Sequence, residues 1–513
     1  MLQGYRARAR VCCDSNSAAP TGSTAAAVDL LICGTPSLWH GRNTSMRQIP
    51  WESADIAPGH IVQWRVRVVG PAPADRPREE YRRSASFNQD KHYSLIEATR
   101  NTEDPLASWL AVTFEVEGTL HRGALEKALL HLVRRHHCLR CEFRRLTEDL
   151  ALAVYGPDDI ELEAVDMGAF DTPQEVRAFL ADSFQKDADT LVWPPYTMGA
   201  VVRDGGSTTV YLAFDHIVSD GMSMPNIAYD VQTAYAAYCA GEDPELPPAG
   251  SYVDFAREQR HRYASIEVDD GSLAYWKAFI ARNGGIFPRF PLDLGAEPGR
   301  LYPAFNESAT LLNDREAEML EVRCREVGGK PFMGLLAAVA VALREEGGPD
   351  LYRALLPVSE RGRDTWRHSV GWFVNTLPIE FSVARELDFA QLIAGVRDGF
   401  STMMESIDVP FVRAWELLAP EYFTGRSWPF PVNFVSYIDM RKCPGAENHA
   451  RWRPMAYVWV SCVNGTTSWF QRDSDGLHIN SIYVDIPQAH QTMARLQDTL
   501  RKTLRTMARS AAM

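Results

Sequence analysis

A histidine and an aspartate four residues apart carry the clearest chemical signal in the chain. His216, Asp220 and Gly221 form the pattern His-x-x-x-Asp-Gly directly after an apolar run at 210–214 that is typical of a strand. An imidazole at the end of a strand can act as a general base, because its ordinary pKa of about 6.5 lies close to physiological pH. Asp220 is too near in sequence to be assumed a triad partner, and it can instead fix the turn by pairing with an arginine. Gly221 allows either a positive φ or the close approach of a substrate to the backbone.

The alternative interpretation of this motif is a strand end with an incidental histidine, followed by a polar turn. Other chemistries find little support in the sequence. It contains no Gly-x-Ser-x-Gly elbow, no Walker A loop and no G-x-G-x-x-G fingerprint. His136 and His137 are adjacent, so on a helix their side chains point about 100° apart and do not chelate one ion. The single C-x-x-C, Cys138 to Cys141, has no second copy, and we expect no metal site.

Composition narrows the class of protein. The 513 residues are enough for two lobes or domains, and the net charge of −13 argues against non-specific binding of nucleic acid. The longest apolar run, 332–343, is far shorter than the roughly 20 residues of a membrane-spanning helix and predicts a buried core helix. Nine scattered cysteines, an odd number, indicate reduced thiols. We therefore expect a cytoplasmic protein without a transmembrane segment.

The chain divides into an N-terminal extension and two halves of similar texture. Residues 1–45 are rich in Ala, Ser, Thr and Gly and predict a disordered extension, with Met46 as the expected functional start. Breaker residues near 284–298 place the boundary between an N-terminal lobe, 46–285, and a C-terminal lobe, 286–513. Helices and strands alternate in both, so the fold class is α/β (α+β). The expected helices are 122–133, 173 onward, 222–238, 252–261, 272–282, 314–327, 332–346, 387–406 and 486–508, and the expected strands are 138–143, 197–203, 209–215, 305–312, 351–358, 376–382, 431–438, 456–463 and 477–484.

Four further stretches look structural when each is taken alone. They are a polar helix entry, a helix end, a turn after a strand and a buried loop that leads into a strand: Ser86-Phe-Asn-Gln-Asp-Lys-His92, Arg135-His-His-Cys-Leu-Arg140, Pro357-Val-Ser-Glu-Arg361 and Gly371-Trp-Phe-Val-Asn-Thr-Leu-Pro378.

In their order and spacing, these stretches and the His216 motif resemble the condensation-domain superfamily, acyltransferases of the chloramphenicol-acetyltransferase-like fold. The segments 250–255 and 283–291 are most similar to the polyketide-associated (Pap-type) acyltransferases of actinobacteria, which acylate trehalose-based glycolipids. The chain departs from the family in one place. The family's motif usually begins with two histidines, and here the first position is Asp215.

The resemblance implies two lobes in a V with an active-site tunnel between them, and it assigns catalysis to His216. Asp220 is expected to pair with Arg361 and to shape the loop, and the backbone N–H of Gly221 to stabilise an oxyanion. Asp215 is expected to be structural, so the missing histidine need not abolish activity. Ser219, Trp372 and Asn375 are assigned to the substrate tunnel, where Ser219 is expected to orient the substrate and Asn375 to hold the tunnel wall.

The implied reaction moves an acyl group from a thioester, either acyl-CoA or a phosphopantetheine-linked group on a carrier protein, to a hydroxyl of a glycolipid or natural-product acceptor. It needs no cofactor beyond the donor and no metal, and we expect a monomer. Two alternatives stay open. One is a free-standing peptide condensation enzyme that acylates an amine, and the other is a catalytically silent module that recruits a carrier protein or another enzyme, a view that Asp215 supports.

Overall fold

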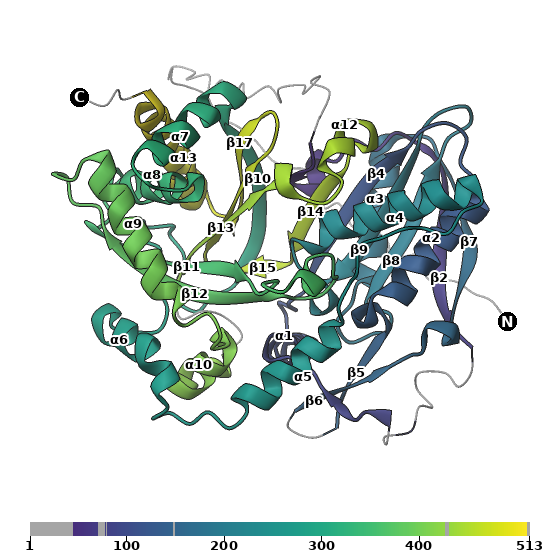
Figure 1. Cartoon of the computed structure of the whole chain (residues 1–513), viewed down its shortest axis with the longest axis horizontal. Helices are drawn as coiled ribbons and strands as arrows, with labels where there is room; N and C mark the ends of the chain where they lie inside the picture. The colour runs from purple at the N-terminus through teal and green to yellow at the C-terminus, as the bar shows by residue number, and fades with distance from the viewer. Residues whose placement is uncertain (1–44, 70–76, 78–79, 147–148, 426–429, 510–513) are drawn as a thin grey trace, which may run out of the picture. The chain divides into compact units, whose positions relative to one another are not determined.

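The computed structural model describes residues 45–69, 77, 80–146, 149–425 and 430–509, which belong to one compact unit. The predicted extension at 1–45 lies outside the described residues, except for Ser45. Two seven-stranded sheets and one three-stranded sheet organise the unit. Figure 1 shows the two large sheets side by side, each with its own helices.

The first large sheet has the order β1-β14-β4-β9-β8-β2-β7, and β9 lies at its centre between the antiparallel strands β4 and β8. All eight residues of β9 are buried, and the run 210–214 within it is apolar, as expected of a strand that is buried on both faces. The strands are β1 (Arg47–Ile49), β2 (Gly59–Val68), β4 (Ser108–Val116), β7 (Ile160–Phe170), β8 (Tyr196–Val202), β9 (Thr208–Asp215) and β14 (Met455–Val460).

Helices cover both faces of this sheet. Alternate residues of β4 point to opposite sides. Leu110, Val112 and Phe114 pack with α2 (Arg122–Arg135) and α4 (Ser223–Ala240), whereas Trp109 and Ala111 pack with α3 (Pro173–Asp187). The predicted opening of α3 is confirmed, because Thr172 and Glu175 form a capping box there.

The second large sheet has the order β12-β11-β13-β16-β17-β10-β15. Residues of α8 and α13 pack on one face of it, and α9 packs against β12. The strands are β10 (Tyr302–Asn313), β11 (Leu351–Ser359), β12 (Val374–Ser382), β13 (Asn433–Asp439), β15 (Cys462–Val463), β16 (Thr466–Arg472) and β17 (Gly476–Val484). The helices around it are α7 (Asp314–Glu326), α8 (Pro331–Glu345), α9 (Phe389–Met404) and α13 (Pro487–Arg509).

Smaller elements accompany the two large sheets, and most of them lie along the lower side of the view in Figure 1. The third sheet has the order β3-β6-β5. These elements are β3 (Arg83–Ser84), β5 (Cys141–Arg145), β6 (Leu150–Val154), α1 (Phe87–Thr99), α5 (Tyr252–Tyr263), α6 (Ala274–Asn283), α10 (Phe411–Leu418), α11 (Pro420–Phe423) and α12 (His449–Trp452).

The predicted boundary after residue 285 does not separate the two large sheets. The expected strand 456–463 is two strands: β14 enters the first sheet beside β1 and β4, and β15 pairs with β10 of the second. Helix α6, assigned to the first lobe, packs in the second core, where Trp276 contacts the ring of Phe411. A hydrophobic pattern predicts that a strand exists but not which strand it joins, so this exchange could not be read from the sequence.

Among the described residues, no single helix is both long and apolar enough to cross a membrane. Helices α7 and α8 meet the criteria of length and composition only together, and they are bent by 102° at their junction. The run 332–343 that predicted a core helix lies within α8, and most of its side chains are buried in the second core, as expected.

Candidate active site

His216 lies where the central strand of the first sheet ends. The strand β9 finishes at Asp215, a short 3₁₀ turn (His216–Val218) follows, and α4 begins at Ser223. The turn is held at both ends. Asp215 Oδ1 accepts a hydrogen bond from the Ile217 N–H at 2.7 Å, and Asp220 Oδ1 accepts one from the Ser223 N–H at 2.8 Å. The loop therefore presents the imidazole from a fixed backbone.

The two nitrogens of His216 have different surroundings. Nδ1 is buried and has no hydrogen-bond partner among the described residues, whereas the side chain as a whole is only partly buried and lines a cavity. Nε2 is thus the nitrogen that a substrate can reach. One face of the ring stacks on Trp372, with ring centroids 3.9 Å apart. Burial, and then the positive charge that His92 can carry, lower the pKa of His216 below its ordinary 6.5. The ring is therefore neutral at pH 7 and can accept a proton.

The predicted ion pair between Asp220 and Arg361 is present. Arg361 donates from both terminal nitrogens to the two carboxylate oxygens, at 2.7 and 2.9 Å, and both side chains are at least 95% buried. Asp220 also accepts from the Phe373 N–H at 3.0 Å. Since His216 and Asp220 belong to the first lobe and Arg361 follows β11 of the second, this pair joins the lobes beside the loop that carries His216.

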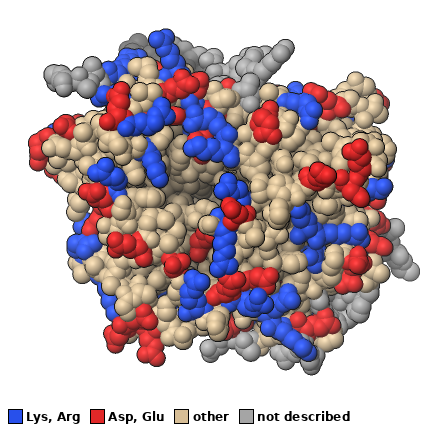
Figure 2. All heavy atoms as spheres, in the orientation of Figure 1, with Lys and Arg blue, Asp and Glu red and all other residues tan. Residues whose placement is uncertain are grey.

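A cavity of about 770 Å³ opens beside His216 and is lined by both lobes. Its walls come from the loop after β9, from β14 and β15, and from the face of the second sheet that is turned away from α8 and α13. Most of the lining is apolar, with Leu95, Leu110, Trp415, Phe434, Val458, Trp469 and Ile482 among its members. Figure 2 shows a hollow lined mainly by uncharged atoms on one face, with acidic and basic side chains interspersed around it.

The structure brings only some of the predicted site residues to this cavity. Gly221 and Trp372 line it, together with His216, Asp220 and Arg361. Gly221 does not have a positive φ, so of the two roles considered for it only the close approach to a substrate fits. The prediction for Ser219 is wrong, because its side chain is fully buried and its hydroxyl donates to the Asp215 carbonyl at 3.0 Å.

Asn375 was expected to hold the tunnel wall, and its side chain makes wall contacts without facing the cavity. Its amide donates to the carbonyls of Ile407 and Val409, both at 2.7 Å, and its oxygen accepts from the Phe411 N–H at 2.9 Å. Both neighbours of Asn375 in β12, Val374 and Thr376, line the cavity instead. Asn375 thus holds the segment before α10 against the cavity wall without facing a substrate.

Comparison with known proteins gives the family. The sequence profile of the condensation domain matches residues 95–430. The chain belongs to the condensation-domain family. The acyltransferase PapA3 of Mycobacterium tuberculosis is 26% identical over 476 residues, which span 89% of this chain and 96% of PapA3. The trehalose-2-sulfate acyltransferase PapA2 of Mycobacterium bovis is 27% identical, over 85% of this chain and 92% of PapA2.

A solved structure agrees with the sequence relatives. The PapA2 acyl transferase superposes with a TM-score of 0.79 at 23% identity, covering 91% of this chain and all of that one. The resemblance to condensation enzymes and to Pap-type acyltransferases is therefore confirmed, as are the two-lobed α/β fold and the assignment of the chain as an acyltransferase.

Two residues of the family's early motif reach the loop that carries His216, and the sequence analysis had assigned them no role. Both come from α1, which begins after the N-cap Ser86. Gln89 donates to the carbonyl of Ile217 at 2.8 Å, and His92 Nε2 lies 3.1 Å from Asp215 Oδ1. Ser86, Gln89 and His92 recur at intervals of three, the spacing that places side chains on one face of a helix. That spacing was the available signal.

His136 and Cys138 of the motif at 135–140 make structural contacts. The Val370 N–H donates to His136 Nδ1, so His136 Nε2 carries the proton that it shares with Asp230 Oδ2 at 2.8 Å. The Cys138 thiol donates to the Val370 carbonyl at 2.9 Å, and burial raises its pKa well above the ordinary value. In the described part of the chain, no three His, Cys, Asp or Glu side chains converge as a metal site would require.

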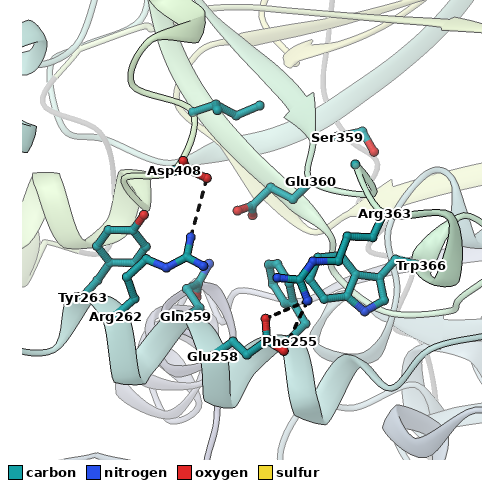
Figure 3. A pocket seen from close by; sticks show the side chains of 12 residues that line it. Phe255, Glu258, Gln259, Arg262, Tyr263, Ser359, Glu360, Arg363, Trp366 and Asp408 are labelled. Atoms are coloured by element: carbon teal, nitrogen blue, oxygen red, sulfur yellow. Dashed lines mark hydrogen bonds and ion pairs between the residues drawn. The ribbon is translucent and has the colours of Figure 1, made fainter.

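A second, smaller pocket of about 260 Å³ adjoins the cavity, and Ser359 lines both. Two ion pairs cross it, between Arg262 and Asp408 and between Arg363 and Glu258 (Figure 3). The carboxyl group of Glu360 points between them, and its Oε2 is buried without a hydrogen-bond partner among the described residues. Burial, with a smaller contribution from the charge of Asp408, raises the pKa of Glu360 to about 8.

Proposed function

We propose that the cavity binds an acyl thioester and a hydroxyl-bearing acceptor, and that His216 is the general base for transfer of the acyl group between them. One observation carries the proposal: the His216 imidazole is buried at Nδ1, so its other nitrogen is the one available to a cavity that both lobes line. Binding both substrates in one cavity makes the reaction step effectively unimolecular.

The chemistry balances without an acyl-enzyme intermediate. His216 Nε2 accepts the proton of the acceptor hydroxyl as its oxygen attacks the thioester carbonyl carbon. The resulting oxyanion lies near the Gly221 N–H, which has no hydrogen-bond partner among the described residues and lies in the cavity lining. The carbon–sulfur bond then breaks, and the imidazolium returns its proton to the departing thiolate. The products are an ester and a free thiol.

The lining of the cavity and the nature of the relatives support a choice of substrates. An apolar cavity of about 770 Å³ suits a hydrocarbon acyl chain, because burial of the chain releases water from both surfaces. A relative named for trehalose-2-sulfate suggests a sugar hydroxyl in a glycolipid as the acceptor. We propose acyl-CoA or a carrier-protein thioester as the donor, no resident cofactor, and a monomeric enzyme.

Substrate profiling of the purified full-length chain tests this function. Thiol release from palmitoyl-CoA is measured with trehalose, with trehalose 2-sulfate, with an amino sugar and without acceptor, and products are identified by mass spectrometry. We expect thiol release that depends on a hydroxyl acceptor, with an ester product. The same donor presented on a phosphopantetheinylated carrier protein then distinguishes the two classes of donor.

The two alternatives predict other outcomes of the same assay. An amide product with amines, and no ester with any hydroxyl acceptor, would identify a condensation enzyme of the peptide-forming type. A silent recruitment module would release no thiol above background with either donor, and its binding to a carrier protein would not need His216.

A further inference from the structure

The carboxylate that precedes His216 is part of a closed hydrogen-bonded cluster. Asp215 is buried, and each of its oxygens has a partner. Oδ1 accepts from the Ile217 N–H and lies 3.1 Å from His92 Nε2, and Oδ2 accepts from the Thr190 hydroxyl at 2.8 Å. The Thr190 hydroxyl also lies 3.1 Å from His92 Nε2. Three elements, β9, α1 and the segment before β8, thus meet at one carboxylate.

This cluster lies against the catalytic imidazole. The ring centroids of His92 and His216 are 6.3 Å apart, and Trp372 contacts both. The indole stacks on His216 and meets His92 edge to face, with centroids 5.5 Å apart. His92 therefore helps to hold Trp372 against His216, although it does not line the cavity.

From this geometry we propose that His92 and Asp215 form a positioning pair that holds His216 and sets the pH range in which its base form is available. This inference rests on the proposed role of His216 as the base. The pair does not touch the substrate. It acts through the position and the charge of its two members.

The two members of the pair, His92 and Asp215, shift the pKa of His216 in opposite directions. The ionisable groups that shift the pKa of His216 most are His92 on α1, Asp215 at the end of β9, and Asp220 in the loop, and Arg361, Asp439 and Lys442 line the same cavity. Asp220 is already neutralised by Arg361. Positive charge at His92 lowers the pKa of His216, and negative charge at Asp215 raises it. Loss of His92 leaves the Asp215 charge uncompensated, whereas loss of the Asp215 charge leaves His92 free to act alone.

The test compares His92→Gln with Asp215→Asn in the full-length enzyme. In the profile of kcat/KM against pH, His92→Gln is expected to shift the acidic limb to higher pH by about 0.5 to 1 unit. This is the size expected for a unit charge at this separation in a partly screened site. Asp215→Asn is expected to shift the acidic limb to lower pH. His490→Gln is the matched control, because it breaks another His–Asp pair, with Asp485, that lies outside the cavity. It should leave the profile unchanged.

A second readout does not depend on turnover. The ring of His216 is titrated by NMR in protein labelled at histidine, and its signal is assigned by its absence from the spectrum of His216→Ala. The pKa of His216 is expected to rise in His92→Gln and to fall in Asp215→Asn. Equal losses of activity in both variants without opposed shifts in either readout would overturn the proposal and leave a structural role. Opposed NMR shifts in a protein that shows no acyl transfer would uphold the pair and refute the proposed function instead.

Discussion

The imidazole of His216 stacks on the indole of Trp372, with centroids 3.9 Å apart and ring planes inclined by 29°. The two side chains come from different lobes, since His216 follows β9 of the first sheet and Trp372 precedes β12 of the second. The orientation of the His216 ring therefore depends on the docking of the two lobes, which the buried pair of Asp220 and Arg361 maintains nearby.

Removal of the indole should misplace the base without unfolding the protein. We expect Trp372→Ala to lower kcat/KM by about 10- to 100-fold, because a displacement of about 1 Å can have an effect of that size. Trp372→Phe keeps an aromatic face and should retain most of the activity. Steady-state kinetics at saturating donor checks this, and equal activity of the Ala variant and the wild type would count against the stacking role.

The pH profile should report a base with a lowered pKa. His216 must be neutral to accept a proton, and its pKa lies below 6.5 because the ring is buried. The decline of kcat/KM on acidification should therefore be centred below pH 6.5. The measurement is a series of kcat/KM values between pH 5 and 8, with stability checked at each pH. A decline that is centred above pH 7 would be incompatible with this assignment.

The pair of Asp220 and Arg361 should contribute more to stability than an exposed pair. Arg361→Ala leaves a buried carboxylate without its partner, and we expect a loss of about 3–5 kcal/mol. Arg367 pairs with Asp364 at the surface, at 3.6 Å and with both side chains largely exposed, so Arg367→Ala should change stability by less than about 1 kcal/mol. Chemical denaturation of both variants makes the comparison, and indistinguishable curves would contradict it.

Gly371 should tolerate no side chain. Its φ is +149°, and a β-carbon there would lie 2.6–2.8 Å from atoms of Tyr252, which is itself fixed by a hydrogen bond to Ser86. Gly371→Ala should lower the free energy of unfolding by about 1–3 kcal/mol or more, because it combines overpacking with backbone strain. Gly285→Ala is the control, since a β-carbon at Gly285 meets nothing within 4 Å. Equal melting temperatures for the two variants would refute the argument.

Glu360 should make stability depend on pH in a defined window. Its pKa is about 8 in the folded protein against an ordinary 4.5, so between these values the folded state binds more protons than the unfolded state. The free energy of unfolding therefore decreases as the pH rises from about 4.5 to 8. Glu360→Gln should match the wild type near pH 4.5 and exceed it by a few kcal/mol above pH 8. If the difference between the two proteins were the same at every pH, burial of an ionisable Glu360 could not be its cause.

Local structure was largely predictable because short-range patterns determine it. The periodicity of 122–133 and the cap at Thr172 placed α2 and α3, and the run 332–343 placed a core helix. The pairing of Asp220 with Arg361 followed from the resemblance. These predictions rest on residues that are close in sequence or fixed by a known motif.

Long-range placement could not be derived in the same way. Which sheet β14 joins depends on contacts between residues several hundred positions apart, and alternation within the strand does not encode them. Side-chain direction explains the error at Ser219, which belongs to the right loop but points away from the cavity. The contact between His92 and Asp215 could not be predicted, because α1 approaches the end of β9 only in the folded protein.

The most direct test of the account is the acyl-transfer rate of His216→Ala, measured beside the wild type and beside His261→Ala, which changes an exposed histidine of α5. We predict that His216→Ala keeps the wild-type melting temperature and loses about 10²- to 10⁴-fold in kcat, whereas His261→Ala is unaffected. A folded His216→Ala variant that transfers the acyl group at the wild-type rate would contradict the central claim.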